Sequence, residues 1–104
     1  MGTFQVVFSS WASRDLEKIV RYIARDNPNA AERFGLQLAD RALSLAEPHI
    51  HNAGGRMPER PGVRKLVLGN YLILYRIIDA QRKVRVLRFW HGAQDRGRLR
   101  GLRG

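Results

Sequence analysis

Apolar residues recur at helical spacing in two stretches of the first half of the chain. The first stretch starts at Trp11, and its apolar face is formed by Ala12, Leu16, Ile19, Val20 and Ile23. The second starts at Pro28 and ends near residues 47–48, with a stripe formed by Ala31, Phe34, Leu38, Ala42 and Leu45. Between them, Asn27 can cap a helix and Pro28 fits a first helical position. The pattern predicts two helices joined as an antiparallel hairpin.

Strand patterns occupy the rest of the chain. Residues 3–8 (TFQVVF) favour a short strand, and the two serines that follow could cap the first helix. Residues 48–62 are rich in Pro and Gly and predict a long loop. Three further strands are expected at 63–68, 71–78 and 83–90. This order predicts an α+β domain, β-α-α-β-β-β, with the helical hairpin on one face of a small antiparallel sheet.

The composition narrows the class of protein. A chain of 104 residues has room for one domain, which we place at residues 1–95, followed by a basic tail at 96–104 (RGRLRGLRG). The chain has no cysteine, which excludes disulfides, thiol nucleophiles and Cys-ligated metals. The longest apolar run, 71–75, is too short to span a membrane, and the first eight residues do not form a secretory signal. We therefore expect a cytoplasmic protein without a cofactor.

Charge is distributed unevenly between the two halves of the chain. Residues 1–52 hold six basic and six acidic side chains, whereas residues 53–104 hold thirteen basic and three acidic ones. The formal net charge of +10 therefore belongs entirely to the second half. This asymmetry favours a polyanionic or acidic partner for that half, the alternative being a solvated face that keeps the protein soluble.

Several blocks together resemble the RelE/ParE superfamily of toxins from bacterial type II toxin–antitoxin modules. They are the pattern DL-x-x-I-x-x-YIA-x-DNP-x-AA over 15–31, VR-x-L-x-LG-x-Y over 63–71, YRI at 75–77, and LR at 87–88 followed by HGAQD at 91–95. The match is strongest to the ParE branch, with Gln94 at a position where that family more usually has arginine. The resemblance implies the RelE/ParE fold and a cognate antitoxin, ParD-like or similar, in a hetero-oligomeric complex.

The superfamily has two mechanistic classes, and the resemblance implies one of them. RelE-type toxins cut mRNA on the ribosome with basic and acid–base side chains, whereas ParE-type toxins inhibit DNA gyrase. Where RelE-like sequences place arginines and a tyrosine, this chain has Leu72, Gly92, Ala93 and Leu99. Such residues can neither neutralise a phosphate nor move a proton. A gyrase inhibitor is therefore the leading hypothesis, with an mRNA endonuclease and a plain nucleic-acid-binding module as the alternatives.

The basic half supplies the candidate target-binding residues. Arg76 and Arg88 are the strongest candidates, because each interrupts an apolar strand where a charge needs a partner. Alternation along the strands could let some of Arg64, Lys65, Arg76 and Arg88 converge on one sheet face. The candidate target-binding set is Arg76, Arg88, His91, Asp95, Arg96 and Arg98. If the chain is a nuclease, the candidate catalytic set is Arg64, Lys65, Arg76 and His91.

Surplus apolar residues on the two helices indicate a second surface. Trp11 and Tyr22 flank the apolar stripe of the first helix, and Leu36 and Leu43 lie opposite that of the second. These residues could either pack between the helices and the sheet or form an exposed groove for an acidic or amphipathic antitoxin segment. His49, His51 and His91 lack a fourth ligand, so no metal site is predicted.

Overall fold

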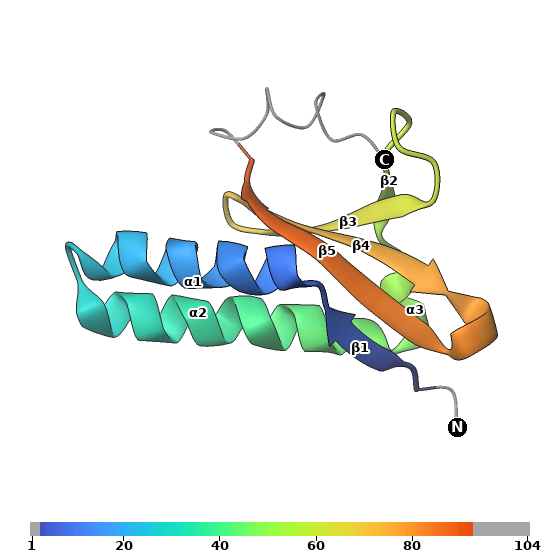
Figure 1. Ribbon diagram of the computed structural model, residues 1–104, viewed down its shortest axis with the longest axis horizontal. Helices are drawn as coiled ribbons and strands as arrows, with labels where there is room; N and C mark the ends of the chain where they lie inside the picture. Colours follow the sequence, from blue (N-terminus) through green and yellow to red (C-terminus); the bar gives the residue numbers. More distant parts are fainter. Residues whose placement is uncertain (1–2, 93–104) are drawn as a thin grey trace.

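The fold is a five-stranded mixed sheet with a helical hairpin on one face (Figure 1). The computed structural model describes residues 3–92. The elements are β1 (Gln5–Phe8), α1 (Ser10–Ala24), α2 (Pro28–Leu43), the 3-10 turn η1 (Ser44–Ala46), α3 (Pro48–His51), β2 (Gly55–Arg56), β3 (Val63–Leu68), β4 (Tyr71–Ile78), the 3-10 turn η2 (Asp79–Gln81) and β5 (Lys83–His91). The predicted α+β class and the helical hairpin are confirmed.

Capping residues fix the ends of both long helices. The Ser9 side chain accepts a hydrogen bond from the Ala12 amide at 3.0 Å, which satisfies a donor at the start of α1. Asn27 does the same for Ala30 at 3.0 Å, and Pro28 occupies the first turn of α2. Asn27 and Pro28 therefore act as predicted. Helix α2 ends at Leu43, earlier than predicted, because the chain tightens into η1.

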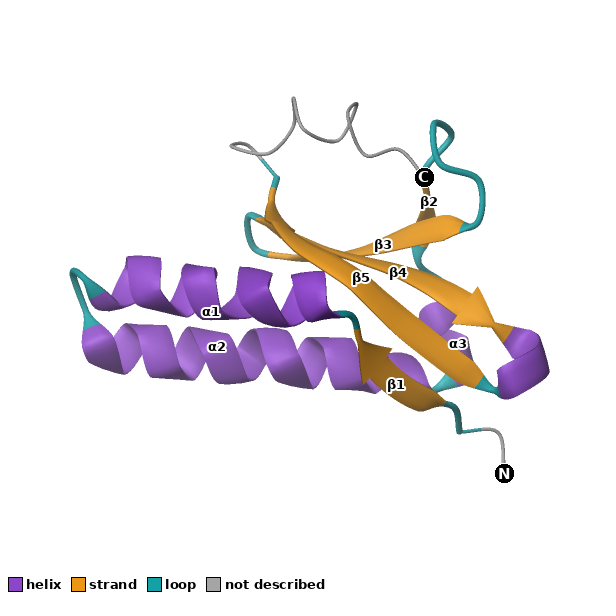
Figure 2. Ribbon diagram, in the orientation of Figure 1, coloured by secondary structure: helices purple, strands orange, loops and turns teal. Residues whose placement is uncertain are grey.

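The strand order is β1-β5-β4-β3-β2. The hairpins β3–β4 and β4–β5 are antiparallel, as predicted, but β1 pairs with β5 in parallel, and this corrects the expectation of a purely antiparallel sheet (Figure 2). Tight turns dictate the pairing of consecutive strands only. Strand β1 is joined to the rest of the sheet through α1 and α2, so no turn between it and β5 fixes its direction.

Two short elements replace the predicted long loop at 48–62. Helix α3 has four residues, and β2 has two residues that pair with Lys65 and Arg64 of β3. Neither is long enough to show a repeating pattern, so sequence periodicity could not reveal them.

The main core lies between the helices and the sheet. Its fully buried members include Leu38 and Leu45 from the helical segment and Ile73, Tyr75 and Val86 from the sheet. The hydroxyl of Tyr75 donates a hydrogen bond of 2.7 Å to the carbonyl of His51, which ties β4 to α3. Burial raises the pKa of the Tyr75 phenol, against the opposing effect of Arg64, so this donor keeps its proton at neutral pH.

Candidate functional site

Sheet alternation gives two faces with different chemistry. We call the face covered by α1 and α2 the inner face and the opposite one the outer face. Ile73 and Tyr75 belong to the inner core, whereas Leu74, between them in sequence, packs in a separate outer cluster. The register then assigns the neighbouring positions of β3 and β5 to one face or the other.

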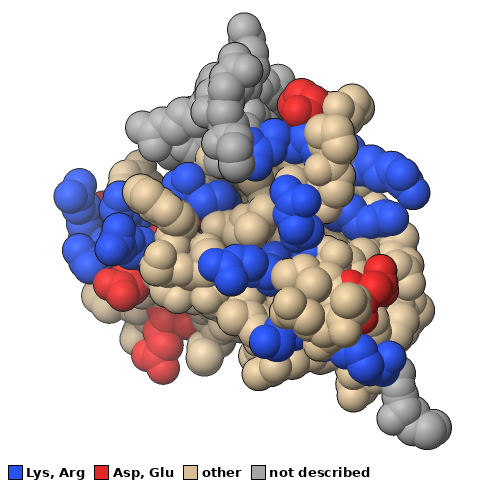
Figure 3. Space-filling model, turned by 45° about the vertical axis from the view of Figure 1, so that its right-hand side comes forward, with Lys and Arg blue, Asp and Glu red and all other residues tan. Residues whose placement is uncertain are grey.

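Four basic side chains gather on the outer face, from three strands. Arg76 of β4 lies directly opposite Arg85 of β5, and Val63 of β3 completes their row. Lys65 of β3 and Lys83 of β5 lie in the adjacent outer rows. Basic side chains are spread across the face drawn in Figure 3, and acidic ones appear at fewer places on it. We call Lys65, Arg76, Lys83 and Arg85 the outer basic cluster.

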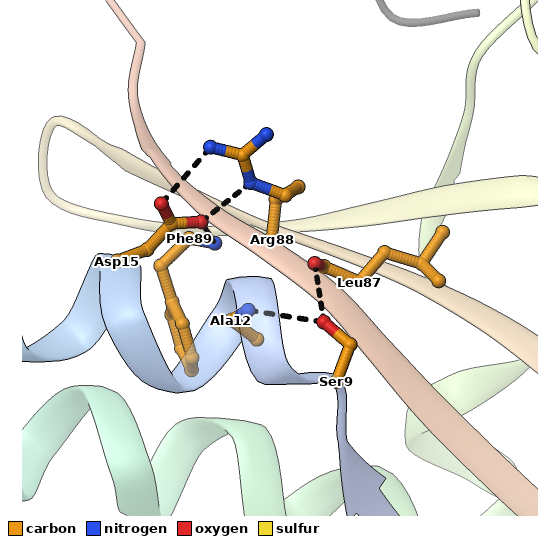
Figure 4. Close-up of polar contacts among 6 residues, drawn as sticks. All are labelled: Ser9, Ala12, Asp15, Leu87, Arg88 and Phe89. Carbon is orange, nitrogen blue, oxygen red and sulfur yellow. Dashed lines mark hydrogen bonds and ion pairs between the residues drawn. The ribbon is translucent and has the colours of Figure 1, made fainter.

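Arg88 shares the outer row of Lys65 and Leu74, but it has a partner within the chain. Its Nε and Nη2 donate hydrogen bonds of 2.6 and 3.0 Å to the two carboxylate oxygens of Asp15 on α1 (Figure 4). The pair is largely buried, with 23% of the Arg88 side chain and 10% of the Asp15 side chain exposed. Arg88 therefore has a structural role in joining the last strand to the first helix.

Asp15 and Ser9 also complete the edge of β5 beyond the end of β1. The Asp15 carboxylate accepts a hydrogen bond of 3.1 Å from the Phe89 amide, and the Ser9 hydroxyl donates one of 2.8 Å to the Leu87 carbonyl (Figure 4). Both backbone groups belong to the stretch of β5 that β1 does not reach. Side chains at the start of α1 thus replace a neighbouring strand.

Two tryptophans flank the Arg88 guanidinium. Its central carbon lies 5.4 Å from the centre of the Trp11 ring and 5.1 Å from that of Trp90. Trp90 belongs to the outer cluster of apolar residues, which also contains Met57, Val63 and Leu74, with Leu72 and Leu87 packed against it. Leu72, at a position where RelE-like sequences place an arginine, therefore lies in apolar packing.

The structure does not bring the four candidate nuclease residues together. Lys65 and Arg76 lie on the outer face. Arg64 lies on the inner face beside Tyr75 and donates hydrogen bonds to the Asn52 and Gly54 carbonyls at 3.2 and 3.0 Å. His91 also lies on the inner side, with its ring edge-on to Tyr71 at 5.0 Å. The sheet separates the set into two pairs.

The four apolar residues predicted to meet an antitoxin are all exposed. Their exposed fractions are 57% for Trp11, 59% for Tyr22, 59% for Leu36 and 52% for Leu43. Packing between the helices and the sheet, the alternative interpretation, is therefore wrong for these side chains. An apolar hollow of about 370 Å³ also runs along α1, lined by Phe8, Ser13, Leu16, Glu17, Val20 and Arg21.

Three predicted target-binding residues, Asp95, Arg96 and Arg98, lie outside the described residues, as does the basic tail 96–104. Within residues 3–92, no three His, Cys, Asp or Glu side chains are placed to hold a metal ion. No helix in that range is long and apolar enough to cross a membrane.

Sequence reasoning missed Asp15, Lys83 and Arg85. Asp15 follows Ala12 by three residues and precedes Ile19 by four, so it lies within the apolar stripe of α1, and a charge there signals a buried partner. Arg85 alternates with Val84 and Val86, which indicates the face opposite the main core. Its position beside Arg76 depends on the strand register, which the sequence alone does not give.

Comparison with known proteins identifies relatives over almost the whole chain. Residues 6–96 match the family model described as the ParE toxin of the type II toxin–antitoxin system parDE. The chain is 30% identical over 100 residues to Toxin RelE1 of Caulobacter vibrioides, covering 90% of this chain and 99% of that protein.

Two solved structures share the fold. The chromosomal ParDE toxin–antitoxin system of P. aeruginosa contains a chain with a TM-score of 0.72 and 22% identity, covering 86% of this chain and 96% of that one. The RelBE2 toxin–antitoxin complex of Mycobacterium tuberculosis contains one with a TM-score of 0.66 and 28% identity, covering 88% of this chain and 93% of that one.

Proposed function

The chain belongs to the ParE toxin family of type II toxin–antitoxin systems, and from this premise we propose that it inhibits DNA gyrase in the cytoplasm and is neutralised by a cognate antitoxin. The observation that carries the choice of target is the separation of the candidate nuclease residues by the sheet. Arg64 and His91 lie on the inner side, whereas Lys65 and Arg76 lie on the outer face.

RNA cleavage needs a group that moves a proton and a cation that stabilises the scissile phosphate, both at one site. On the described outer face, the cations have no histidine beside them, and Leu72 is packed among apolar side chains. This arrangement supports a surface that binds a target without chemistry. The basic residues of the second half of the chain would then contact gyrase or the DNA that gyrase holds.

Inducing the chain in a bacterium without its antitoxin tests the target directly. Gyrase inhibition that traps cleaved DNA is expected to stop growth with an early DNA-damage response, while incorporation of labelled amino acids continues at first. The measurements are a damage-responsive reporter and pulse labelling of new protein. Immediate loss of labelling without a damage response would instead identify translation as the target.

A ribosome-dependent mRNA endonuclease is the second candidate, favoured by the 30% identity to Toxin RelE1. Primer extension on ribosome-bound message separates the two. Codon-specific cuts that disappear in His91→Ala or Arg76→Ala would favour the nuclease, and a message left intact by the parent chain would refute it.

The exposed apolar residues of the helical hairpin are the proposed antitoxin-binding surface. The solved relatives are toxin–antitoxin complexes, which supports an antitoxin partner for this chain. Tyr22 and Trp11 lie three helical turns apart, so they follow one stripe of α1, and Leu36 and Leu43 follow one stripe of α2. The apolar hollow is a separate surface, because Leu16 and Val20 lie about half a turn around α1 from Trp11 and Tyr22.

Replacing Tyr22 or Leu36 with aspartate is expected to weaken binding of the cognate antitoxin roughly tenfold or more, because a charge would be buried in an apolar contact. Val67→Asp is the matched control, since Val67 is 57% exposed but lies on β3, away from the helices. Titration of the purified toxin with antitoxin measures the change. Equal weakening by all three substitutions would contradict this location.

A further inference from the structure

Arg76 and Arg85 form a like-charged pair that the sheet itself does not explain. They occupy directly opposite positions on β4 and β5, where side chains lie about 5 Å apart and like charges destabilise the sheet. Their row continues to Val63 on β3 and Val7 on β1, so it contains no carboxylate. Neither arginine forms an ion pair with a described residue.

The rest of the outer basic cluster increases the positive charge around this pair. Lys83 lies two residues before Arg85, about 7 Å along the strand. Lys65 lies in the next outer row, with its stem against Gly55. Among the described residues, no carboxylate belongs to the outer rows of the strands, and Asp15, which reaches Arg88 from α1, is bound to that arginine. The cluster therefore presents four cations without acidic neighbours in their rows.

A glycine leaves room for one arginine of the pair. Gly62 has a φ of +84°, and a Cβ built there would lie 2.9 Å from an Nη atom of Arg76. The Arg76 guanidinium thus rests against the bare backbone of Gly62, and any other residue would be strained and would displace it. The loop before β3 therefore leaves room for the guanidinium, and no described acidic side chain pairs with it.

We propose that the outer basic cluster, centred on Arg76 and Arg85, binds the phosphate backbone of DNA. Paired guanidinium groups match the geometry of phosphate oxygens. A protein partner would need an exposed apolar anchor, and the rows of Arg76, Arg85 and Lys83 contain none of the large exposed apolar side chains of the described residues. The exposed Val67 lies on the same face but at its far side, two residues beyond Lys65. A phosphate backbone needs only charge and donors, so binding would not depend on sequence.

This inference deepens the proposed function, because it supplies the surface through which a gyrase inhibitor would also engage the DNA that gyrase holds. It can be tested on the full chain without gyrase. Fluorescence anisotropy with a short labelled duplex, over a series of salt concentrations, measures both the affinity and its salt dependence.

The parent chain is expected to bind with log affinity falling linearly with log salt. Arg76→Gln and Arg85→Gln should each weaken binding roughly tenfold at low salt and reduce the slope by about one. Gly62→Ala should weaken binding without changing the net charge, because it displaces Arg76. Arg33→Gln is the matched control: it removes an exposed charge from α2, which lies on the other side of the sheet, and should change binding less than twofold at about 0.1 M salt, where the screening length is about 10 Å.

Equal effects of Arg33→Gln and Arg85→Gln, or no DNA binding at low salt, would overturn the proposal, as would binding to an acidic peptide but not to duplex DNA. Circular dichroism and thermal unfolding of each variant check that it folds.

A supercoiling assay on the same variants separates this proposal from the proposed function. DNA binding without gyrase inhibition would refute the proposed function alone, and gyrase inhibition that survives the loss of DNA binding would refute this role for the cluster alone.

Discussion

Replacing Asp15 with alanine is expected to lower the free energy of unfolding by about 3 kcal/mol. The substitution removes both hydrogen bonds to the Arg88 guanidinium and leaves the Phe89 amide without its acceptor. Because the Asp15 side chain is only 10% exposed, water cannot easily replace these contacts. Urea unfolding followed by circular dichroism measures the change.

Glu17→Gln on the same helix is the matched control. Its carboxylate pairs with Arg21 at 3.1 Å, but the side chains are 66% and 76% exposed. Solvent screens such a pair, so Glu17→Gln should lower the free energy of unfolding by about 0.5 kcal/mol or less. If Asp15→Ala and Glu17→Gln cost the same, the Asp15–Arg88 pair would not hold the last strand to the first helix.

Gly54→Ala is expected to destabilise the fold by about 3 kcal/mol, since the methyl group would overlap a buried tyrosine. A Cβ at Gly54 would lie 1.8 Å from the Tyr75 hydroxyl. Tyr75 is fully buried, and its hydroxyl is held by the His51 carbonyl, so the ring cannot move aside without losing that bond. Thermal and urea unfolding measure the effect.

The neighbouring glycine provides the control for this prediction. A Cβ at Gly55 would meet only the stem of Lys65, at 3.3 Å, and that flexible side chain can shift, so Gly55→Ala should cost less than about 1 kcal/mol. Combining Gly54→Ala with Tyr75→Phe removes the overlapping oxygen. The double variant should therefore lose less free energy of unfolding than the sum of the losses in the two single variants. Strict additivity would show that the overlap is not the cause.

The elements that could be predicted from the sequence are those with a repeating pattern or a strong local signal. The β3 and β4 boundaries at 63–68 and 71–78 agree with the structure, and Asn27 caps α2 as expected. The parallel pairing of β1 with β5 could not be predicted, because 74 residues separate Phe8 from Lys83 and no turn links them directly. Long-range packing decides such a pairing.

The sequence indicated which part of the chain supplies the candidate site, but not how its residues are arranged. Charge asymmetry pointed to the basic second half, and interrupted apolar strands pointed to Arg76 and Arg88. Which arginine has an internal partner depends on a contact between residues 73 positions apart, Asp15 and Arg88. The β4–β5 register shifts between Leu74 and Tyr75, and an extra residue in one strand reverses the faces of all that follow, so alternation in the sequence does not give the face of Arg88.

Supercoiling by purified DNA gyrase is the measurement that tests the central claim most directly. Relaxed plasmid, gyrase and ATP are incubated with an excess of the full chain, with and without the cognate antitoxin. We predict that the chain stops supercoiling and leaves cleaved plasmid DNA, and that the antitoxin restores the reaction. Supercoiling that proceeds unchanged in the presence of excess folded toxin would contradict gyrase as the target.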